Sequence, residues 1–363
     1  HFNLKTFASA TFISNAITLA KIIGNFMAAG ILNRLYPKKA IGLGSGLIVL
    51  GSTLAIFAPQ YWLFILGRFI MGFGGALYVV YFSPVVIHYF ESKKRLTVNA
   101  LNGAAYNFGG IVAMVIVGPV IIWLKTWQYS MGFFAAVSAL LWPLFGQDFE
   151  LNRSTGTGQA PYTIREAMKE KINWILPFTY SGLLTFYIVM LNIFPISGVT
   201  AISSKALGTL VAIGGIIGSL LAIALGKVYF KRLPVIRYSG LAMTLFGLLM
   251  LRTDSSLLSA VAAFLIGMFM FLPVSSLMMI PQELPGMTPS KLTTIMGLFW
   301  ALSYIIETAA YFIIGFIIDR FGYGMGLNFA LIMSVTFFLG SFLLPETGKG
   351  GKSEKVNAKL KCS

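Results

Sequence analysis

The chain has 363 residues, of which 57% are hydrophobic and only 10% are charged, and its formal net charge is +16. Soluble globular domains carry about 25% charged residues, so this composition excludes an ordinary soluble enzyme. One cysteine, Cys362, and two distant histidines, His1 and His88, provide no disulfide and no metal-ligand spacing. We therefore predict no enzymatic activity, no cofactor and no metal site.

Apolar runs of about the length of a membrane-spanning helix occupy most of the chain. They lack the two-residue alternation of barrel strands, so we predict an all-α polytopic membrane protein. In chain order the eleven runs are Phe7–Leu32, Ala40–Ala58, Tyr61–Tyr89, Val98–Leu124, Trp127–Phe145, Asn173–Ile196, Lys205–Phe230, Pro234–Leu251, Ser255–Ile280, Leu292–Ile318 and Tyr323–Leu344. Pro273 interrupts the ninth of these runs and predicts a bend there.

The basic residues fall mainly on one side of the predicted membrane. Of 27 lysines and arginines, 20 lie in alternate loops and the C-terminal tail, and two, Lys21 and Arg68, lie inside runs. Because cytoplasmic loops are enriched in these residues, we expect the basic side and the C-terminus to be cytoplasmic, in the cell (inner) membrane. The positive charge is thus a topology signal in a lipid-bilayer protein, and we predict no nucleic-acid partner.

A long polar segment divides the runs into groups of five and six. Residues 147–171 contain a flexible Ser-Thr-Gly-Thr-Gly stretch and a predicted amphipathic helix at Thr163–Lys171. The predicted domains are an N-terminal bundle at 1–146, a cytoplasmic linker at 147–171, a C-terminal bundle at 172–345 and a basic cytoplasmic tail at 346–363.

Several motifs, in the expected order, resemble those of the major facilitator superfamily. Gly67–Gly75 is similar to the family's fourth-helix pattern, in which an arginine precedes a glycine cluster, and Pro345–Gly348 is similar to a common ending. The resemblance implies two bundles of six helices that transport by alternating access. About eleven of the twelve helices are present, with Phe7–Leu32 as family helix two. An incomplete chain or a natural eleven-helix variant would explain the difference.

The loop between the first two runs resembles the family's repeated cytoplasmic gate motif. Arg34, Lys38 and Lys39 fit that motif, whereas Asn33 stands where the family has an aspartate that helps close the cytoplasmic side. We expect the gate here either to lack that lock or to use a neutral hydrogen bond.

Three ionisable residues, Lys21, Arg68 and Glu307, lie well inside runs, where an isolated charge costs roughly 2.5–3.5 kcal/mol. Lys21 and Glu307 each lie twelve residues, about 18 Å, from a helix end. The resemblance implies that helices two and eleven face each other, so we expect Lys21 and Glu307 to pair. The pair could break during transport, with Glu307 taking a proton or Lys21 holding an anion; it could be static; or Lys21 could simply reach cavity water.

Other candidates carry less specific signals. Arg68 resembles an arginine linked in the family to proton coupling or anion binding, although a hydrogen bond to the helix-one backbone would also explain it. His88 is predicted to be a surface residue rather than a proton relay. Trp300, Tyr304 and Glu307 share one helix face, although most aromatics in such chains serve packing. The remaining substrate-contact candidates are Asn25, Asn102, Tyr180 and Asn192.

No ATP-binding motif is visible, so we predict a secondary active transporter of a small polar organic solute. Two membrane-embedded cations against one carboxylate favour an organic anion or zwitterion, moved by a monomeric proton symporter. A drug or metabolite efflux antiporter that uses protons is the first alternative. A non-transporting membrane sensor on the same fold is the alternative from another class.

Overall fold

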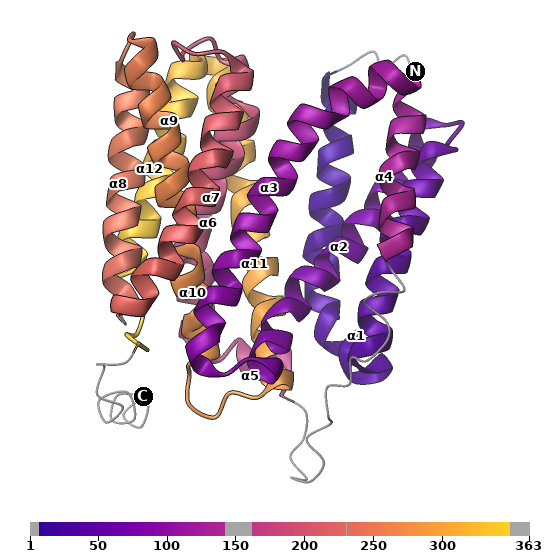
Figure 1. Ribbon diagram of the computed structural model, residues 1–363, viewed down its shortest axis with the longest axis vertical. Helices are drawn as coiled ribbons and strands as arrows, with labels where there is room; N and C mark the ends of the chain where they lie inside the picture. Colours follow the sequence, from indigo (N-terminus) through magenta and orange to yellow (C-terminus); the bar gives the residue numbers. More distant parts are fainter. Residues whose placement is uncertain (1–6, 142–161, 230, 349–363) are drawn as a thin grey trace. The chain divides into compact units, whose positions relative to one another are not determined.

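The computed structural model describes residues 7–141, 162–229 and 231–348. These residues form twelve α-helices and one 3-10 helix, and no strand occurs among them (Figure 1). The elements are α1 Phe7–Ile56, α2 Tyr61–Tyr89, α3 Ser92–Leu124, α4 Trp127–Leu141, α5 Ile164–Ala167, α6 Ile172–Asn192, η2 Phe194–Ile196, α7 Ser204–Val228, α8 Leu233–Arg252, α9 Ser256–Phe271, α10 Val274–Gln282, α11 Pro289–Phe321 and α12 Tyr323–Gly340.

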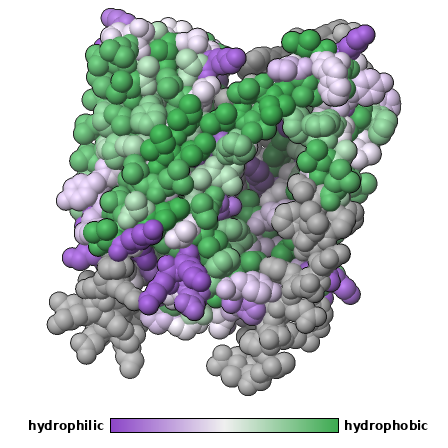
Figure 2. Space-filling view, viewed as in Figure 1, coloured by the Kyte–Doolittle hydropathy of each residue, from purple (hydrophilic) through white to green (hydrophobic). Residues whose placement is uncertain are grey.

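The surface of these helices is apolar where a soluble protein would be polar. Nine helical segments of the described chain are long and apolar enough to cross a membrane, and Ala16–Leu32 is a shorter apolar helix. On α8, for example, Leu241, Leu245 and Leu248 lie on one face and are exposed. Figure 2 shows apolar side chains over much of the visible surface. The predicted all-α, polytopic membrane fold is confirmed.

The predicted loop between the first two runs is helical in the structure. Backbone α-helix is assigned from Phe7 to Ile56, with Pro37 inside it. Gly24 packs on Ala76 of α2 and Gly44 packs on Gly74, only two residues away. A straight helix would place residues 24 and 44 about 30 Å apart, so α1 must reverse direction between them. Proline removes a backbone hydrogen bond and kinks a helix, which accounts for a reversal near Pro37.

Glycines allow the second half of α1 to approach α2 closely. A Cβ atom on Gly51 would lie 2.4 Å from the backbone nitrogen of Met71, and one on Gly74 would lie 2.5 Å from the carbonyl oxygen of Gly44. No side chain fits at such distances, and small residues commonly mediate helix packing in membranes. The glycine-rich motif of α2 therefore serves packing at Gly67, Gly72 and Gly74.

Proline also explains the break in the ninth run. The predicted run Ser255–Ile280 forms two helices, α9 and α10, and Pro273 lies directly before α10.

The predicted amphipathic helix at Thr163–Lys171 is shorter than expected, because only Ile164–Ala167 is α-helical.

The described contacts divide the chain into two compact units. Unit 1 comprises His1–Tyr89, Val115–Glu170 and Thr288–Tyr304, and unit 2 comprises Phe90–Met114, Lys171–Met287 and Ile305–Ser363. Helices α3 and α11 therefore contribute residues to both units. The division into bundles at 1–146 and 172–345 stays a prediction.

Candidate functional site

The candidate site lies within unit 1, where α1 and α11 approach each other most closely. A Cβ atom on Gly297 of α11 would lie 2.5 Å from the backbone oxygen of Asn25 on α1. Only glycine allows this approach, so Gly297 sets the distance between the two helices. Residues one or two turns away on each helix, including Lys21 and Tyr304, can then come into contact.

The Lys21 side chain meets the aromatic residues that the sequence placed on one face of α11. Its Nζ atom donates a hydrogen bond of 3.4 Å to the Tyr304 hydroxyl oxygen and lies 4.9 Å from the centroid of the Tyr304 ring. The Trp300 ring stacks on Tyr304, with centroids 6.0 Å apart and an interplanar angle of 29°. An ammonium over an aromatic face is attracted by the ring quadrupole, so Tyr304 stabilises the Lys21 charge through two neutral contacts.

Acidic residues are absent from the part of the sequence that carries Lys21, whereas α11 carries Glu307 three residues after Tyr304. The sequence from His1 to Phe90 has no aspartate or glutamate, although it includes Lys21 and Arg68. In the described part of unit 1 the acids are Glu166, which caps α5, and Glu170, which lies 3.3 Å from Lys291. Both belong to the region of the predicted linker. The first 90 residues therefore carry only basic charged side chains.

Asn25 adds a buried polar group to the same helix face as Lys21, one turn away. The residue is only 1% exposed. Neither its Oδ1 nor its Nδ2 atom has a hydrogen-bond partner among the described residues. An unsatisfied buried polar group costs about 1–3 kcal/mol, so this carboxamide is a candidate for binding a water or a solute group.

Arg68 lies on α2 without a carboxylate contact among the described residues. Its Nη1 atom is 4.0 Å from the sulfur of Met71, and its Nε atom is buried without a hydrogen-bond partner there. The roles expected for Arg68 in proton coupling or anion binding stay predictions.

Glu307 is a buried carboxyl on the unit 2 part of α11. It is 4% exposed, and Thr308 donates a hydrogen bond of 3.5 Å to its Oε2 atom. Lys21 belongs to unit 1, so the expected Lys21–Glu307 pair stays a prediction.

The structure brings some of the predicted residues together and leaves others apart. Lys21, Asn25, Trp300 and Tyr304 gather at the α1–α11 crossing. Tyr180 is buried in α6 of unit 2, whereas Asn102 and Asn192 of the same unit are exposed.

The predicted gate residues lie at the reversal of α1. Arg34, Lys38 and Lys39 are exposed there. The side chain of Asn33 lies outside the described residues, so its role in a gate stays a prediction.

The sequence analysis missed a buried amide pair in unit 2. Asn99 of α3 and Gln282 of α10 exchange two hydrogen bonds, each 3.3 Å long, and are 4% and 3% exposed. Asn99 also donates to the backbone oxygen of Arg95 at 2.9 Å. The signal available was weak, because each residue is simply a polar side chain near the end of an apolar run.

A second missed cluster lies at the N-terminus of α8. Arg232 contacts Glu283 through two hydrogen bonds, of 2.8 and 3.3 Å, and Thr347 donates to the same carboxylate at 2.7 Å. Glu346 accepts from the backbone nitrogens of Arg232 and Leu233 at 2.7 and 3.0 Å. Glu346 belongs to the Pro345–Gly348 motif, which therefore caps α8. The motif itself was the available signal.

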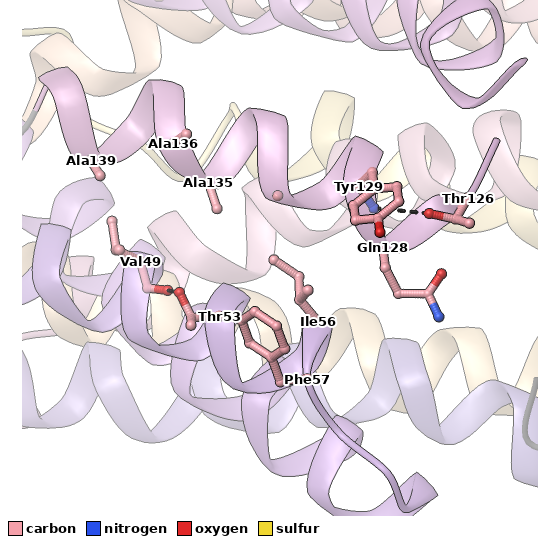
Figure 3. Close-up of a pocket in the computed structure, with 11 residues that line it drawn as sticks. Val49, Thr53, Ile56, Phe57, Thr126, Gln128, Tyr129, Ala135, Ala136 and Ala139 are labelled. Atoms are coloured by element: carbon pink, nitrogen blue, oxygen red, sulfur yellow. Dashed lines mark hydrogen bonds between the residues drawn. The ribbon is translucent and has the colours of Figure 1, made fainter. Parts of the chain in front are cut away.

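An open groove of about 710 Å³ lies between α1 and α4 (Figure 3). Its lining includes Ile56, Phe57 and three alanines of α4. The lining residue Thr53 donates its hydroxyl hydrogen bond to the backbone oxygen of Val49 in its own helix. The groove contains none of the predicted site residues and no charged side chain. We therefore do not assign the candidate site to it.

The long apolar helices are those of a polytopic membrane protein. The sequence model of the Major Facilitator Superfamily matches residues 3–306. The chain therefore belongs to this family and is an integral multi-pass membrane protein.

Two relatives with curated sequences are themselves uncharacterised. A Campylobacter jejuni protein is 27% identical over 180 residues, covering 49% of this chain and 55% of the relative. A protein of Mesomycoplasma hyopneumoniae strain J is 20% identical over 190 residues, covering 46% of this chain and 39% of the relative. The matched segment thus spans about half or less of these relatives.

Solved structures match over nearly the whole chain. The Escherichia coli fucose:proton symporter FucP has a TM-score of 0.74 at 18% identity, covering 93% of this chain and 91% of FucP. The proton:xylose symporter XylE has a TM-score of 0.75 at 18% identity, covering 98% and 90%. The human organic anion transporter MFSD10 has a TM-score of 0.71 at 15% identity, covering 93% and 83%. At these identities the likeness shows the fold alone.

Proposed function

We propose that the protein is a secondary active transporter that moves a small polar organic solute across the membrane by alternating access. The observation that carries the proposal is the position of Lys21. Its ammonium lies at the α1–α11 crossing beside Tyr304, on a stretch of 90 residues without any acid. A half-buried cation beside an aromatic pair favours an anionic or zwitterionic solute.

The names of the structural neighbours agree with this proposal. FucP and XylE are described as proton symporters, and MFSD10 as an organic anion transporter. We infer proton coupling for this chain as well, in a monomer that lies in the cell (inner) membrane with its C-terminus in the cytoplasm.

We assign proton coupling to Glu307. Its carboxyl is buried, and its described hydrogen bond comes from the neutral Thr308 hydroxyl. Gaining or losing a proton would change the net charge of this interior position by one unit. A charge change of this kind biases the equilibrium between two transporter states when the group is desolvated differently in each.

Accumulation of labelled solutes in proteoliposomes tests the proposal. We expect an imposed pH gradient to drive accumulation of one or more organic acids by the wild type. Glu307→Gln should abolish accumulation while retaining exchange of internal for external solute, because exchange requires no net proton movement. Asp319→Gln, at the end of the same helix, is the control and should accumulate solute as the wild type does. Absence of any transport of a broad panel of organic acids, amino acids and sugars would contradict the proposal.

A further inference from the structure

We propose that a groove at the junction of α7 and α8 binds an anionic phospholipid, with part of one acyl chain inside the groove and the phosphate beside Lys231 and Arg237. Every residue that lines the groove belongs to unit 2. The inference goes beyond the proposed transport function and does not depend on it.

The groove is an apolar cavity of about 210 Å³ between the end of α7, the first turns of α8 and the end of α9. Its buried lining includes Leu272 and Ser239, whereas Leu225, Tyr229 and Tyr238 are exposed at its mouth. Pockets for small solutes usually measure about 300–1,000 Å³. This smaller, apolar groove therefore fits a segment of a hydrocarbon chain better than a whole solute.

The mouth of the groove continues into exposed apolar rows on two helices that are long and apolar enough to cross a membrane. On α7, the exposed Leu221 lies one turn before Leu225, and on α8 the exposed Leu241 follows Tyr238 at helical spacing. Exposed apolar surface on a membrane-spanning helix contacts lipid chains. The bilayer can therefore supply the chain that fills the groove, and the rest of that chain can lie along these rows.

Two basic side chains lie next to the groove. Lys231 is exposed and lies two residues before α8, and Arg237 directly precedes Tyr238. The Arg237 guanidinium carbon lies 4.3 Å from the centroid of the Phe342 ring, and its Nη2 atom donates a hydrogen bond of 3.5 Å to the Ser341 backbone oxygen. In the described part of the chain neither basic side chain forms an ion pair with a carboxylate.

The acids at the same end of α8 have other partners. Glu283 forms its ion pair with Arg232, and Glu346 accepts hydrogen bonds from the first backbone N–H groups of α8. Residues 171–253 contain no aspartate or glutamate at all. The basic side chains beside the groove therefore favour an external anion.

A phospholipid supplies both the anion and the hydrocarbon. Basic pockets between membrane helices bind anionic lipid headgroups, and each lysine or arginine near the membrane surface raises the affinity about fivefold. The exposed hydroxyls of Tyr229 and Tyr238 can donate hydrogen bonds to phosphate oxygens. A free anion would neutralise the basic side chains but would leave the apolar groove open, so the occupant is a lipid.

Two lipids with identical acyl chains test the headgroup. Binding of dioleoyl-phosphatidylglycerol and dioleoyl-phosphatidylcholine to the delipidated full chain in detergent is measured by native mass spectrometry. We expect one phosphatidylglycerol to bind at least about tenfold more tightly than phosphatidylcholine, because two basic side chains contribute. Glycerol 3-phosphate, which has the phosphate but no acyl chain, should not compete.

Variants test the two parts of the site separately. Lys231→Gln and Arg237→Gln should each weaken phosphatidylglycerol binding about fivefold and leave phosphatidylcholine binding unchanged. Lys205→Gln, which removes an exposed lysine at the opposite end of α7, is the matched control and should bind as the wild type does. Leu225→Trp places a larger side chain at the mouth and should weaken binding of both lipids. Leu248→Trp, at an exposed position of α8 outside the groove, should not.

Circular dichroism and melting temperatures confirm that each variant is folded. The inference is wrong if the wild type binds the two lipids equally or binds neither, or if folded Lys231→Gln keeps the full affinity for phosphatidylglycerol. It is also wrong if Leu225→Trp leaves both affinities unchanged, because the lipid would then lie elsewhere. A lipid-free dimer that Leu225→Trp converts to a monomer would mean that a second copy of the chain fills the groove instead.

Discussion

The α-carbon of Gly297 lies against the backbone oxygen of Asn25, so closely that a Cβ atom would be 2.5 Å from that oxygen. This single contact between α11 and α1 sets the spacing at which Lys21 reaches Tyr304. It therefore gives a direct way to disturb the candidate site without changing any of its polar residues.

Gly297→Ala should force α1 and α11 apart and lower both thermal stability and transport. Overpacking of this kind costs about 1–3 kcal/mol. Gly315→Ala on the same helix is the matched control, since no atom lies within 4 Å of its Cβ position. The control should be neutral or slightly stabilising, because alanine favours helix over glycine. Equal melting temperatures for Gly297→Ala and the wild type would contradict the close approach.

The effects of substituting Asn99 and Gln282 in unit 2 on the free energy of unfolding should not be additive. Asn99→Ala or Gln282→Ala alone leaves a buried amide without its partner, at a cost of about 1–3 kcal/mol. The double variant should lose less than the sum of the two, since no orphaned partner remains. Denaturant or thermal unfolding of the four proteins measures the difference. If the losses in unfolding free energy of the two single variants add up to that of the double variant, the two side chains do not stabilise each other, and the prediction is wrong.

The contribution of Arg232 to the stability of the protein should depend on the shape of its guanidinium group as well as on its charge. Its guanidinium contacts the Glu283 carboxylate through two nitrogens, which the single ammonium of a lysine cannot reproduce. We expect Arg232→Lys to recover only part of the stability, about 1.5–3 kcal/mol, that Arg232→Ala loses. The exposed neighbour Lys231 is the control, and Lys231→Ala should change the melting temperature little. Full recovery by lysine would mean that charge alone is sufficient.

The short helix α5 should lose protection in acid. The Thr163 backbone N–H and hydroxyl donate to the Glu166 carboxylate at 2.7 and 2.9 Å, and these hydrogen bonds hold the pKa of Glu166 below its usual value of 4.5. A carboxyl with a lowered folded-state pKa stabilises the helix above its usual pKa, and this contribution is lost as the pH falls through the folded-state value.

Hydrogen-exchange protection factors of the α5 amides measure this effect between neutral pH and about pH 3.5. We expect protection to fall with pH in the wild type. Glu166→Gln should show lower protection that no longer varies with pH in this range. The same acid dependence in both proteins would indicate another titrating group.

The membrane-spanning segments were largely predictable because their ends carry clear signals. The run Tyr61–Tyr89 coincides with α2, since Pro59 precedes it and Glu91 follows it. The break at Pro273 was predictable because proline cannot continue the hydrogen-bond ladder. The region around Pro37 was harder, because helical backbone continues to both sides of the reversal and the charged residues there suggested a loop.

The candidate site was only half predictable. Periodicity placed Trp300 and Tyr304 on one face of a helix, and burial cost singled out Lys21 as functional. The contact between Lys21 and Tyr304 depends instead on the packing at Gly297, which no local pattern reveals. Asn99 and Gln282 were missed for the same reason, because 183 residues separate the two partners.

Transport of organic acids by variants that keep or remove the charge of residue 21 tests the central claim most directly. Initial rates of uptake into proteoliposomes of a labelled organic acid that the wild type accumulates are compared for the wild type, Lys21→Arg, Lys21→Gln and Lys39→Gln. We predict that the wild type, Lys21→Arg and Lys39→Gln transport this acid and that Lys21→Gln loses at least about tenfold in rate at low solute concentration. Wild-type rates in folded Lys21→Gln would contradict the assignment of Lys21 to the substrate site.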